Sequence, residues 1–109
     1  MTSPGFAFST RFRVRYAEID GQKVVFNSRY LEYADVAITE YWRAADMAAL
    51  PEWKHAEFHV VHADVTYRKP FRYDDMIEAS VRTDPIGTTS LVTLIELAHA
   101  DTRDLHTRI

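Results

Sequence analysis

The stretch from Tyr16 to Tyr33, YAEIDGQKVVFNSRYLEY, places a carboxylate, Asp20, between a strand-like pattern and the start of a helical pattern. A helix N-terminus carries unpaired backbone N–H groups and a partial positive charge, which can stabilise an oxyanion that develops beside it. A carboxylate close to such a site can attack an activated acyl group or activate a water molecule. The pairing of Asp20 with a helix start therefore suggests acyl transfer to water.

Asp20 also has a purely local explanation. It lies in the tripeptide IDG after a predicted strand. Asp is favoured in turns because its side chain hydrogen-bonds to nearby backbone groups. The spacing alone leaves both roles open and favours the local one.

Composition restricts the classes of protein that the chain can represent. With 109 residues, 47% of them hydrophobic, residues 1–109 are expected to form one domain. The net charge of −3 and the scattered Lys and Arg residues argue against a nucleic-acid partner. The lack of cysteine excludes disulfides and fits a reducing, cytoplasmic location. No run of about 18 apolar residues occurs, so neither a membrane partner nor a signal segment is expected.

One long helix is predicted after Asp20. It begins at Asn27 or Ser28, either of which can cap a helix, and continues to Asp46 with apolar residues at three- and four-residue spacing. Its apolar arc is widened by Leu31, Val36 and Trp42. We therefore expect the helix to be covered over much of its circumference, wrapped by a sheet.

Alternation of apolar and polar residues predicts the strands that form this sheet. Strands are expected over Phe8–Tyr16, Val61–Arg68, Met76–Thr83 and Ser90–Ala98, and a short fifth strand over residues 105–109. The segment DPIG supplies a turn between the third and fourth strands. The order of strand, long helix and an antiparallel run of strands predicts an α+β fold with a single helix.

The motifs around these elements resemble a known family. The segments RYAEIDGQKVVFNSRYLEYADVAITEYWR and ADVTYRKPFRYDDMIEASVR are similar to the 4-hydroxybenzoyl-CoA thioesterase family of hot-dog fold proteins. In that family an acid precedes a short loop, a V-V-[FY]-[NH] step and a helix with Tyr ten residues after the acid. These positions are occupied here by Asp20, by residues 24–27 and by Tyr30. The resemblance covers roughly residues 8–97 and implies a hot-dog domain.

The resemblance implies an acyl-CoA thioesterase that releases free acid and CoA. Asp20 is then the general base or the nucleophile, and the backbone N–H at Asn27 polarises the thioester carbonyl. Active sites at the boundary between subunits are also implied, so a homodimer or homotetramer is expected. The expected substrate contacts are Val25, Phe26, Ser28, Tyr30, Asp64, Thr66, Arg68 and Lys69.

Several of these contacts also have plainer interpretations. Arg68, Lys69 and Arg72 can meet the phosphates of coenzyme A or can form a solvated turn. Asp64 and Thr66 can line a pocket across a subunit interface or can be exposed strand residues.

The chain departs from the family pattern at two places. Lys23 stands where the family usually has glycine three residues after the acid, and Gly21 is the only glycine in the loop. If positive φ is needed in this loop, either Lys23 strains or crowds the site or Gly21 supplies the positive φ, and we favour Gly21. The sequence ends at Ile109, before the end of the family's last strand, so that strand is expected to be short or truncated.

Other activities lack their motifs. The sequence has no G-x-S-x-G, P-loop or dinucleotide motif, and no cofactor is expected. His55, His59 and His62 do not share one face of a strand, so no metal site is expected. A hot-dog dehydratase or hydratase usually needs a histidine near the helix start, and none lies between Met1 and Lys54. A non-catalytic acyl-thioester binding protein remains an alternative.

Overall fold

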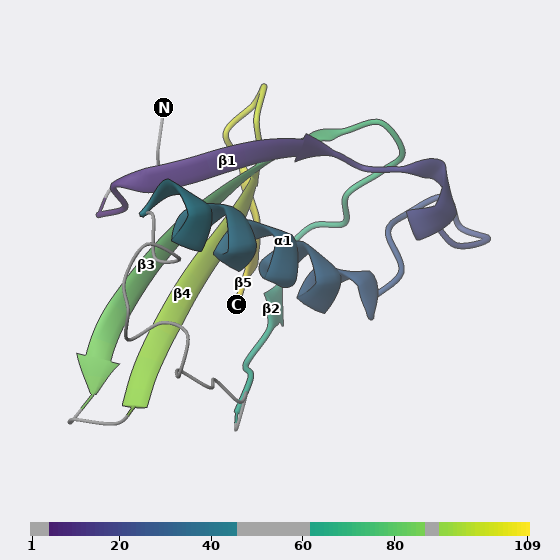
Figure 1. Ribbon diagram of the computed structural model, residues 1–109. Coiled ribbons are helices and arrows are strands. Elements are labelled where there is room, and N and C mark those ends of the chain that lie inside the picture. The colour runs from purple at the N-terminus through teal and green to yellow at the C-terminus, as the bar shows by residue number, and fades with distance from the viewer. Residues whose placement is uncertain (1–4, 46–61, 87–89) are drawn as a thin grey trace.

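The protein packs one helix against one face of a five-stranded sheet (Figure 1). The computed structural model describes residues 5–45, 62–86 and 90–109. The helix, α1, spans Arg29–Ala44, and a short 3-10 turn, η1, spans Tyr16–Glu18. The strands are β1 (Phe8–Arg13), β2 (Thr66–Tyr67), β3 (Met76–Ile86), β4 (Ser90–His99) and β5 (Leu105–Arg108). All strand pairs are antiparallel, which confirms the predicted α+β arrangement and its short last strand.

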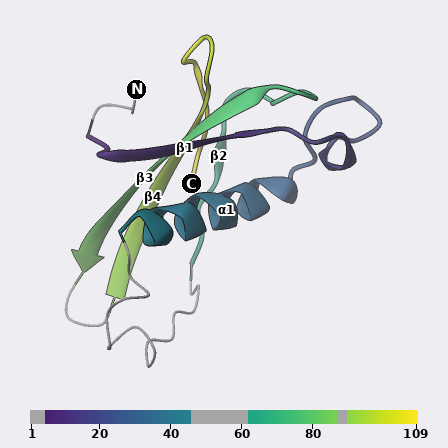
Figure 2. The same ribbon diagram turned by 45° about the horizontal axis from the view of Figure 1, so that its top comes forward.

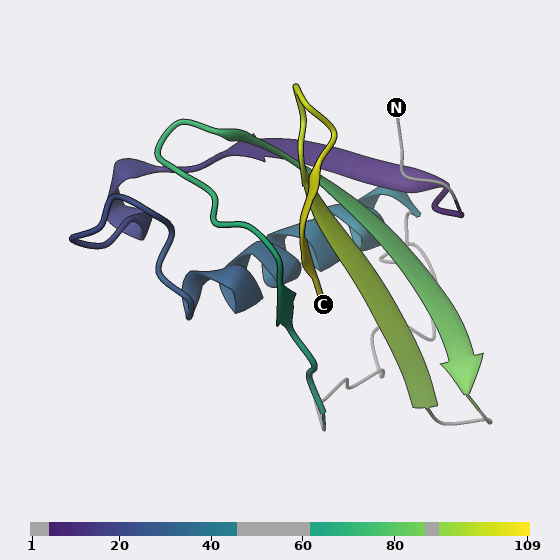
Figure 3. The same ribbon diagram turned by 180° about the vertical axis from the view of Figure 1, so that it is seen from behind.

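The sheet has the order β1-β3-β4-β5-β2. Figures 2 and 3 show the long β3 and β4 strands crossing the helix, which lies on one side of the sheet only. Residues directly opposite each other in an antiparallel pair share a face. Ala79 therefore faces the helix with Leu97, as Val81 does with Ile95, and all four side chains are buried.

The helix buries one stripe against this sheet. Tyr30, Tyr33, Ala34 and Ala37 are buried, at the spacing expected for one helical face. The prediction that the helix is covered over much of its circumference is wrong within the chain, because Leu31 is 50% exposed and Val36 is 40% exposed. Both flank the buried stripe, and a sheet on one side of a helix covers only that stripe.

Three of the observed strands begin or end several residues away from the bounds that the alternation of apolar and polar residues predicted. β1 ends at Arg13, because Val14 then exchanges backbone hydrogen bonds with the turn at Asp74 and Asp75. β2 contains only Thr66–Tyr67 of the predicted strand, and Val61 lies outside the described residues. β3 continues through Pro85 instead of turning there. β1 pairs with β3 only as far as Val81, and beyond it no strand of the described residues pairs with that edge of β3, where proline is tolerated.

A buried histidine joins β5 to the segment that follows β2. The His106 ring stacks on Phe71 at 4.3 Å, and its backbone C=O accepts hydrogen bonds from the N–H groups of Arg68 and Lys69. Its Nδ1 atom is buried and has no hydrogen-bond partner within the described segments. Burial, followed by the charges of His99 and Lys69, holds the pKa of His106 below its ordinary value.

This environment predicts a pH-dependent stability. The unfolded chain takes up a proton on His106 near pH 6.5, whereas the folded chain does so only at lower pH. Stability is therefore complete above about pH 6.5 and falls as the pH decreases toward the folded pKa. We expect His106→Phe, which keeps a ring on Phe71, to cost less than about 1.5 kcal/mol at pH 7 and to weaken this pH dependence.

Urea unfolding between pH 7 and pH 5 measures the effect. His62→Gln is the matched control, because His62 is 75% exposed and its removal is expected to leave the pH dependence unchanged. A wild-type stability that responds to pH in the same way as that of His106→Phe would contradict the assignment.

Candidate active site

The segment between η1 and α1 forms a small hairpin. The Phe26 N–H donates to the Glu18 C=O at 3.0 Å, and the Asp20 N–H donates to the Val24 C=O at 2.9 Å. Ile19 and Val25 form the bridge between these two bonds. We refer to residues 18–26 as the Asp20 hairpin. Because opposite residues share a face, Asp20 lies on the same face as Val24.

The tip of the Asp20 hairpin requires a left-handed residue. The Lys23 N–H donates to the Asp20 C=O at 2.9 Å, and Lys23 has a φ of 65°. A turn followed by one left-handed residue is a common three-residue hairpin loop, and glycine normally occupies that last position. Lys23 is placed there at a cost of roughly 1 kcal/mol. The expectation that Gly21 supplies the positive φ is wrong, since Gly21 is not left-handed and has open space where a Cβ would lie.

The side chain of Asp20 takes part in this turn. Its Oδ1 accepts the Gln22 N–H at 2.8 Å, the local bond that favours Asp in turns. Its Oδ2 makes no hydrogen bond within the segments that the structure describes.

The Asp20 hairpin is attached to the segment that follows β2. The Val25 N–H donates to the Phe71 C=O at 2.9 Å, and Val24 forms a bridge with Arg72. The Phe71 N–H in turn donates to the buried Tyr30 Oη at 3.2 Å, which ties the same segment to α1. The helix start is thus held from two sides.

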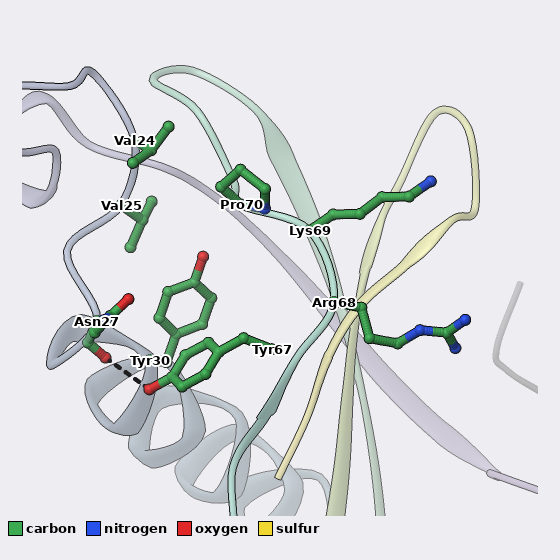
Figure 4. Close-up of a pocket in the computed structure, with 8 residues that line it drawn as sticks. All are labelled: Val24, Val25, Asn27, Tyr30, Tyr67, Arg68, Lys69 and Pro70. Atoms are coloured by element: carbon green, nitrogen blue, oxygen red, sulfur yellow. Dashed lines mark hydrogen bonds between the residues drawn. The ribbon is translucent and has the colours of Figure 1, made fainter.

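A cleft of about 190 Å³ opens where these segments meet (Figure 4). Its lining comprises Val24, Val25, Asn27, Tyr30, Tyr67, Arg68, Lys69 and Pro70. The Tyr67 Oη closes one side by donating to the Asn27 C=O at 3.2 Å. Figure 4 shows the Arg68 and Lys69 side chains extending away from Asn27, and Lys69 Nζ reaches Asp104 at 3.1 Å.

The cleft brings together only some of the predicted site residues. Those that line it are Val25, Asn27, Tyr30, Arg68 and Lys69, and those that do not are Asp20, Phe26, Ser28, Asp64 and Thr66. Asp20 is adjacent, across the Asp20 hairpin from Val24, which does line the cleft. Tyr67 is a cleft residue that sequence reasoning missed, because alternation placed it on the face of a longer strand.

The helix start presents unused backbone donors. α1 begins at Arg29, and Ser28, one of the two predicted caps, is its N-cap without a side-chain capping bond. The N–H groups of Arg29 and Tyr30 donate to the C=O groups of Phe26 and Asn27. Within the described ranges, the N–H groups of Asn27 and Ser28 donate to no protein atom. Two amides at a helix N-terminus are therefore available to an anion or to a polarised carbonyl.

A buried carboxylate, Glu18, holds the Asp20 hairpin in place. Its side chain is 4% exposed and accepts hydrogen bonds from the Arg15 N–H, from the Arg15 guanidinium and from Tyr33 Oη at 2.8–3.1 Å. Burial opposes the charged form, but the bonds from Arg15 and Tyr33 outweigh it and hold the pKa of Glu18 below its ordinary value. Burial and then the bond to Glu18 raise the pKa of Tyr33 well above its ordinary value.

The amino-acid sequence contains only a weak indication of this role. Arg15 and Glu18 are three residues apart, a spacing that allows an ion pair in a helical turn. Nothing in that spacing indicates that the carboxylate is buried or that it meets Tyr33, which lies 15 residues away.

The remaining candidates lie at the surface. Asp64 pairs with His62 at 3.0 Å, and both side chains are exposed. Thr66, on β2, lies opposite Arg108 of β5. His55 and His59 lie outside the described residues. Among residues 5–45, 62–86 and 90–109, no three potential ligands are grouped so that they could hold a metal ion. The helix described there is also not long and apolar enough to cross a membrane.

Comparison with known proteins identifies the family. The model of the thioesterase superfamily matches residues 22–106, so the chain belongs to this superfamily and is a thioester hydrolase. No curated protein gives a significant sequence match. The predicted family is confirmed by this match, and the predicted hot-dog fold is confirmed by the similar solved structures.

Three solved structures illustrate the similarity. A thioesterase from Thermus thermophilus, complexed with coenzyme A and Zn, is 25% identical with a TM-score of 0.78, over 95% of this chain and 79% of that one. A 1,4-dihydroxy-2-naphthoyl-CoA thioesterase from Synechocystis is 20% identical with a TM-score of 0.78, over 93% and 75%. A hypothetical protein from Aquifex aeolicus is 22% identical with a TM-score of 0.82, over 93% and 81%.

The position of Glu18 predicts a specific loss of stability. Glu18→Gln keeps the shape but removes the charge that Arg15 and Tyr33 meet, and we expect a loss of about 1–3 kcal/mol at pH 7. Since the folded pKa is lowered, this contribution is complete above the unfolded value of about 4.3 and is lost as the pH falls through the folded value. The difference between wild type and variant should therefore shrink in acid.

Urea unfolding from pH 7 to pH 3 measures this difference. Glu32→Gln is the matched control, because Glu32 forms an exposed i,i+3 pair with Arg29 and should change stability by less than about 0.5 kcal/mol. Equal effects of the two variants would show that the buried carboxylate has no special role.

Proposed function

We propose that the protein hydrolyses acyl-CoA thioesters to a free acid and CoA. The observation that carries this proposal is the pair of unused backbone N–H groups of Asn27 and Ser28 at the N-terminus of α1, with Asn27 in the cleft wall. Donors placed in this way stabilise the oxyanion that forms when a thioester carbonyl is attacked. Asp20 supplies the carboxylate that the reaction needs, from the face of the Asp20 hairpin that it shares with Val24.

Two roles of Asp20 satisfy the chemistry. As a general base, its carboxylate accepts a proton from water while the water oxygen bonds to the carbonyl carbon. The tetrahedral oxyanion then collapses, the C–S bond breaks, and the CoA thiolate takes up the proton. As a nucleophile, the carboxylate bonds to the carbonyl carbon and expels the thiolate, and water hydrolyses the resulting anhydride. The N–H groups of Asn27 and Ser28 meet the same oxyanion in both cases.

Coenzyme A is the carrier that the family likeness favours. The similar thioesterase from Thermus thermophilus was crystallised with coenzyme A, and the Synechocystis enzyme is described as acting on an aromatic acyl-CoA. The cleft wall includes Arg68, whose guanidinium has no ion-pair partner within the described ranges. A panel of short, long and aromatic acyl-CoAs, assayed by thiol release, identifies the acyl group.

The role of Asp20 is tested by Asp20→Asn, which keeps the size and the bond to Gln22 but removes basicity. We expect kcat to fall by about 10²-fold or more on the best substrate, with a much smaller change in substrate affinity. Asp35→Asn, on the exposed side of α1, is the control and should retain activity. Full activity of Asp20→Asn would remove Asp20 from the chemistry. Binding without hydrolysis in the wild type would favour the acyl-thioester binding protein instead.

We also propose that the enzyme acts as a homodimer or homotetramer in the cytoplasm, with sites shared between subunits. The apolar residues Phe26 and Leu31 at the helix start are 53% and 50% exposed, as expected where a second copy packs. Sedimentation at micromolar concentration should therefore give a dimer or a larger species. A fully active monomer would contradict the shared site.

Mixed dimers distinguish a shared site from a site within one chain. If Asp20 and the Arg68 and Lys69 side chains of different subunits serve one substrate, Asp20→Asn chains mixed with Arg68→Ala/Lys69→Ala chains should regain part of the activity. Mixed dimers that form without regaining activity would place each site within one chain.

A further inference from the structure

Lys23, at the tip of the Asp20 hairpin, has a strained backbone. Its conformation favours glycine and therefore does not explain why a lysine stands there. Lys23 has a φ of 65°, in the region that favours glycine. Gly21, two residues earlier, has no such need. Strained residues persist mainly where the side chain or the conformation serves a function. The ammonium group of Lys23 is therefore a candidate for a functional contact.

Lys23 lies beside a second unpaired cation. The bridge between Val24 and Arg72 brings the hairpin tip next to the segment 71–73. Neither the Lys23 ammonium nor the Arg72 guanidinium forms an ion pair within the segments that the structure describes. Both side chains are exposed.

The acidic groups around these two cations are already engaged. Asp74 lies 3.6 Å from Arg13, Asp75 accepts the Arg72 N–H and lies 3.4 Å from His99, and Glu18 is bonded to Arg15. Asp20 accepts the Gln22 N–H through Oδ1 and forms no ion pair with Lys23 or Arg72 within the described segments. The two unpaired cations therefore remain available for an external anion.

An exposed aromatic pair completes this surface. Tyr73 directly follows Arg72 and meets Tyr16 edge to face, with ring centroids 5.7 Å apart and an interplanar angle of 89°. The two residues are 53% and 74% exposed, so a large part of each side chain is open to solvent. Aromatic faces bind the flat rings of nucleobases, and neighbouring cations bind phosphates.

We propose that Lys23, Arg72 and the Tyr16–Tyr73 pair bind the 3′-phosphorylated ADP portion of a CoA substrate. This inference rests on the proposed function. Val24 both lines the cleft and pairs with Arg72, so the surface begins at the cleft wall, and the pantetheine arm of CoA spans the interval. Arg72 and Lys23 then bind phosphate oxygens, and Tyr73 stacks on adenine, with the Tyr16 ring perpendicular to it.

The direct test measures binding of adenosine 3′,5′-bisphosphate by titration calorimetry at low salt, without any acyl group. We expect Lys23→Gly to weaken binding about threefold to tenfold, Arg72→Gln to do the same, and Lys23→Arg to restore it. The change Lys23→Gly also relieves the backbone, so its melting temperature should rise by about 4 °C. A gain in stability together with a loss of affinity excludes misfolding as the cause.

Two controls separate charge and stacking. Arg43→Gln removes an exposed cation at the other end of α1 and should leave binding unchanged. Tyr73→Ala should weaken binding of the bisphosphate but not of inorganic pyrophosphate. Equal loss of both ligands would overturn the stacking part of the proposal.

A kinetic comparison separates this inference from the proposed function. The ratio of kcat/KM for an acyl-CoA to that for the same acyl-pantetheine should fall about threefold to tenfold in Lys23→Gly, through KM rather than kcat. Bisphosphate binding that depends on Lys23, in a protein that hydrolyses no thioester, would retain the nucleotide site and refute the proposed function. Hydrolysis with no bisphosphate binding in the wild type, or with equal binding by Lys23→Gly, would overturn the nucleotide site alone.

Discussion

The geometry of the site depends on the hydrogen bonds of one buried residue, Glu18. Its backbone C=O accepts the Phe26 N–H and closes the Asp20 hairpin, while its side chain bonds to Tyr33 on α1. One residue therefore fixes the acid and the helix start relative to each other. A buried carboxylate without partners would cost several kcal/mol, so the bonds from Arg15 and Tyr33 make this arrangement possible and also make it specific.

The rest of the fold extends this constraint to the cleft. Tyr30 and Tyr33 belong to the buried stripe of α1. The Tyr30 ring packs against Tyr67 and Phe71, and the Tyr33 ring against Phe12 of β1. Tyr33 then bonds to Glu18, and Tyr30 bonds to the Phe71 N–H. The sheet core, the Asp20 hairpin and the segment after β2 are joined through these two hydroxyl groups. The amides of Asn27 and Ser28 can remain unused because the surrounding bonds already hold the chain in place.

The sequence predicted the parts of this structure that depend on local pattern. Periodicity located α1, β3, β4 and the short β5, and the motif around Asp20 identified the family. It did not predict the exposure of Leu31 and Val36, because periodicity defines an apolar arc but not how much of it another layer covers. Burial of Glu18 and the place of Tyr67 in the cleft depend on contacts between distant segments, and a single sequence carries no direct signal for such contacts.

Lys23 shows how local and functional constraints compete at one residue. The hairpin needs a left-handed residue after its turn, and any side chain other than glycine, asparagine or aspartate is disfavoured there. The sequence predicted that Gly21 adopts the positive φ, because glycine usually does so. The hydrogen bond from the Lys23 N–H to the Asp20 C=O closes the turn, and the left-handed residue is therefore the third residue after Asp20, which is Lys23. The same turn orients the Asp20 carboxylate through Gln22. Backbone strain at Lys23 and the placement of Asp20 are therefore properties of one hairpin. A substitution that relieves the strain at Lys23 leaves the hydrogen bonds that hold Asp20 in place.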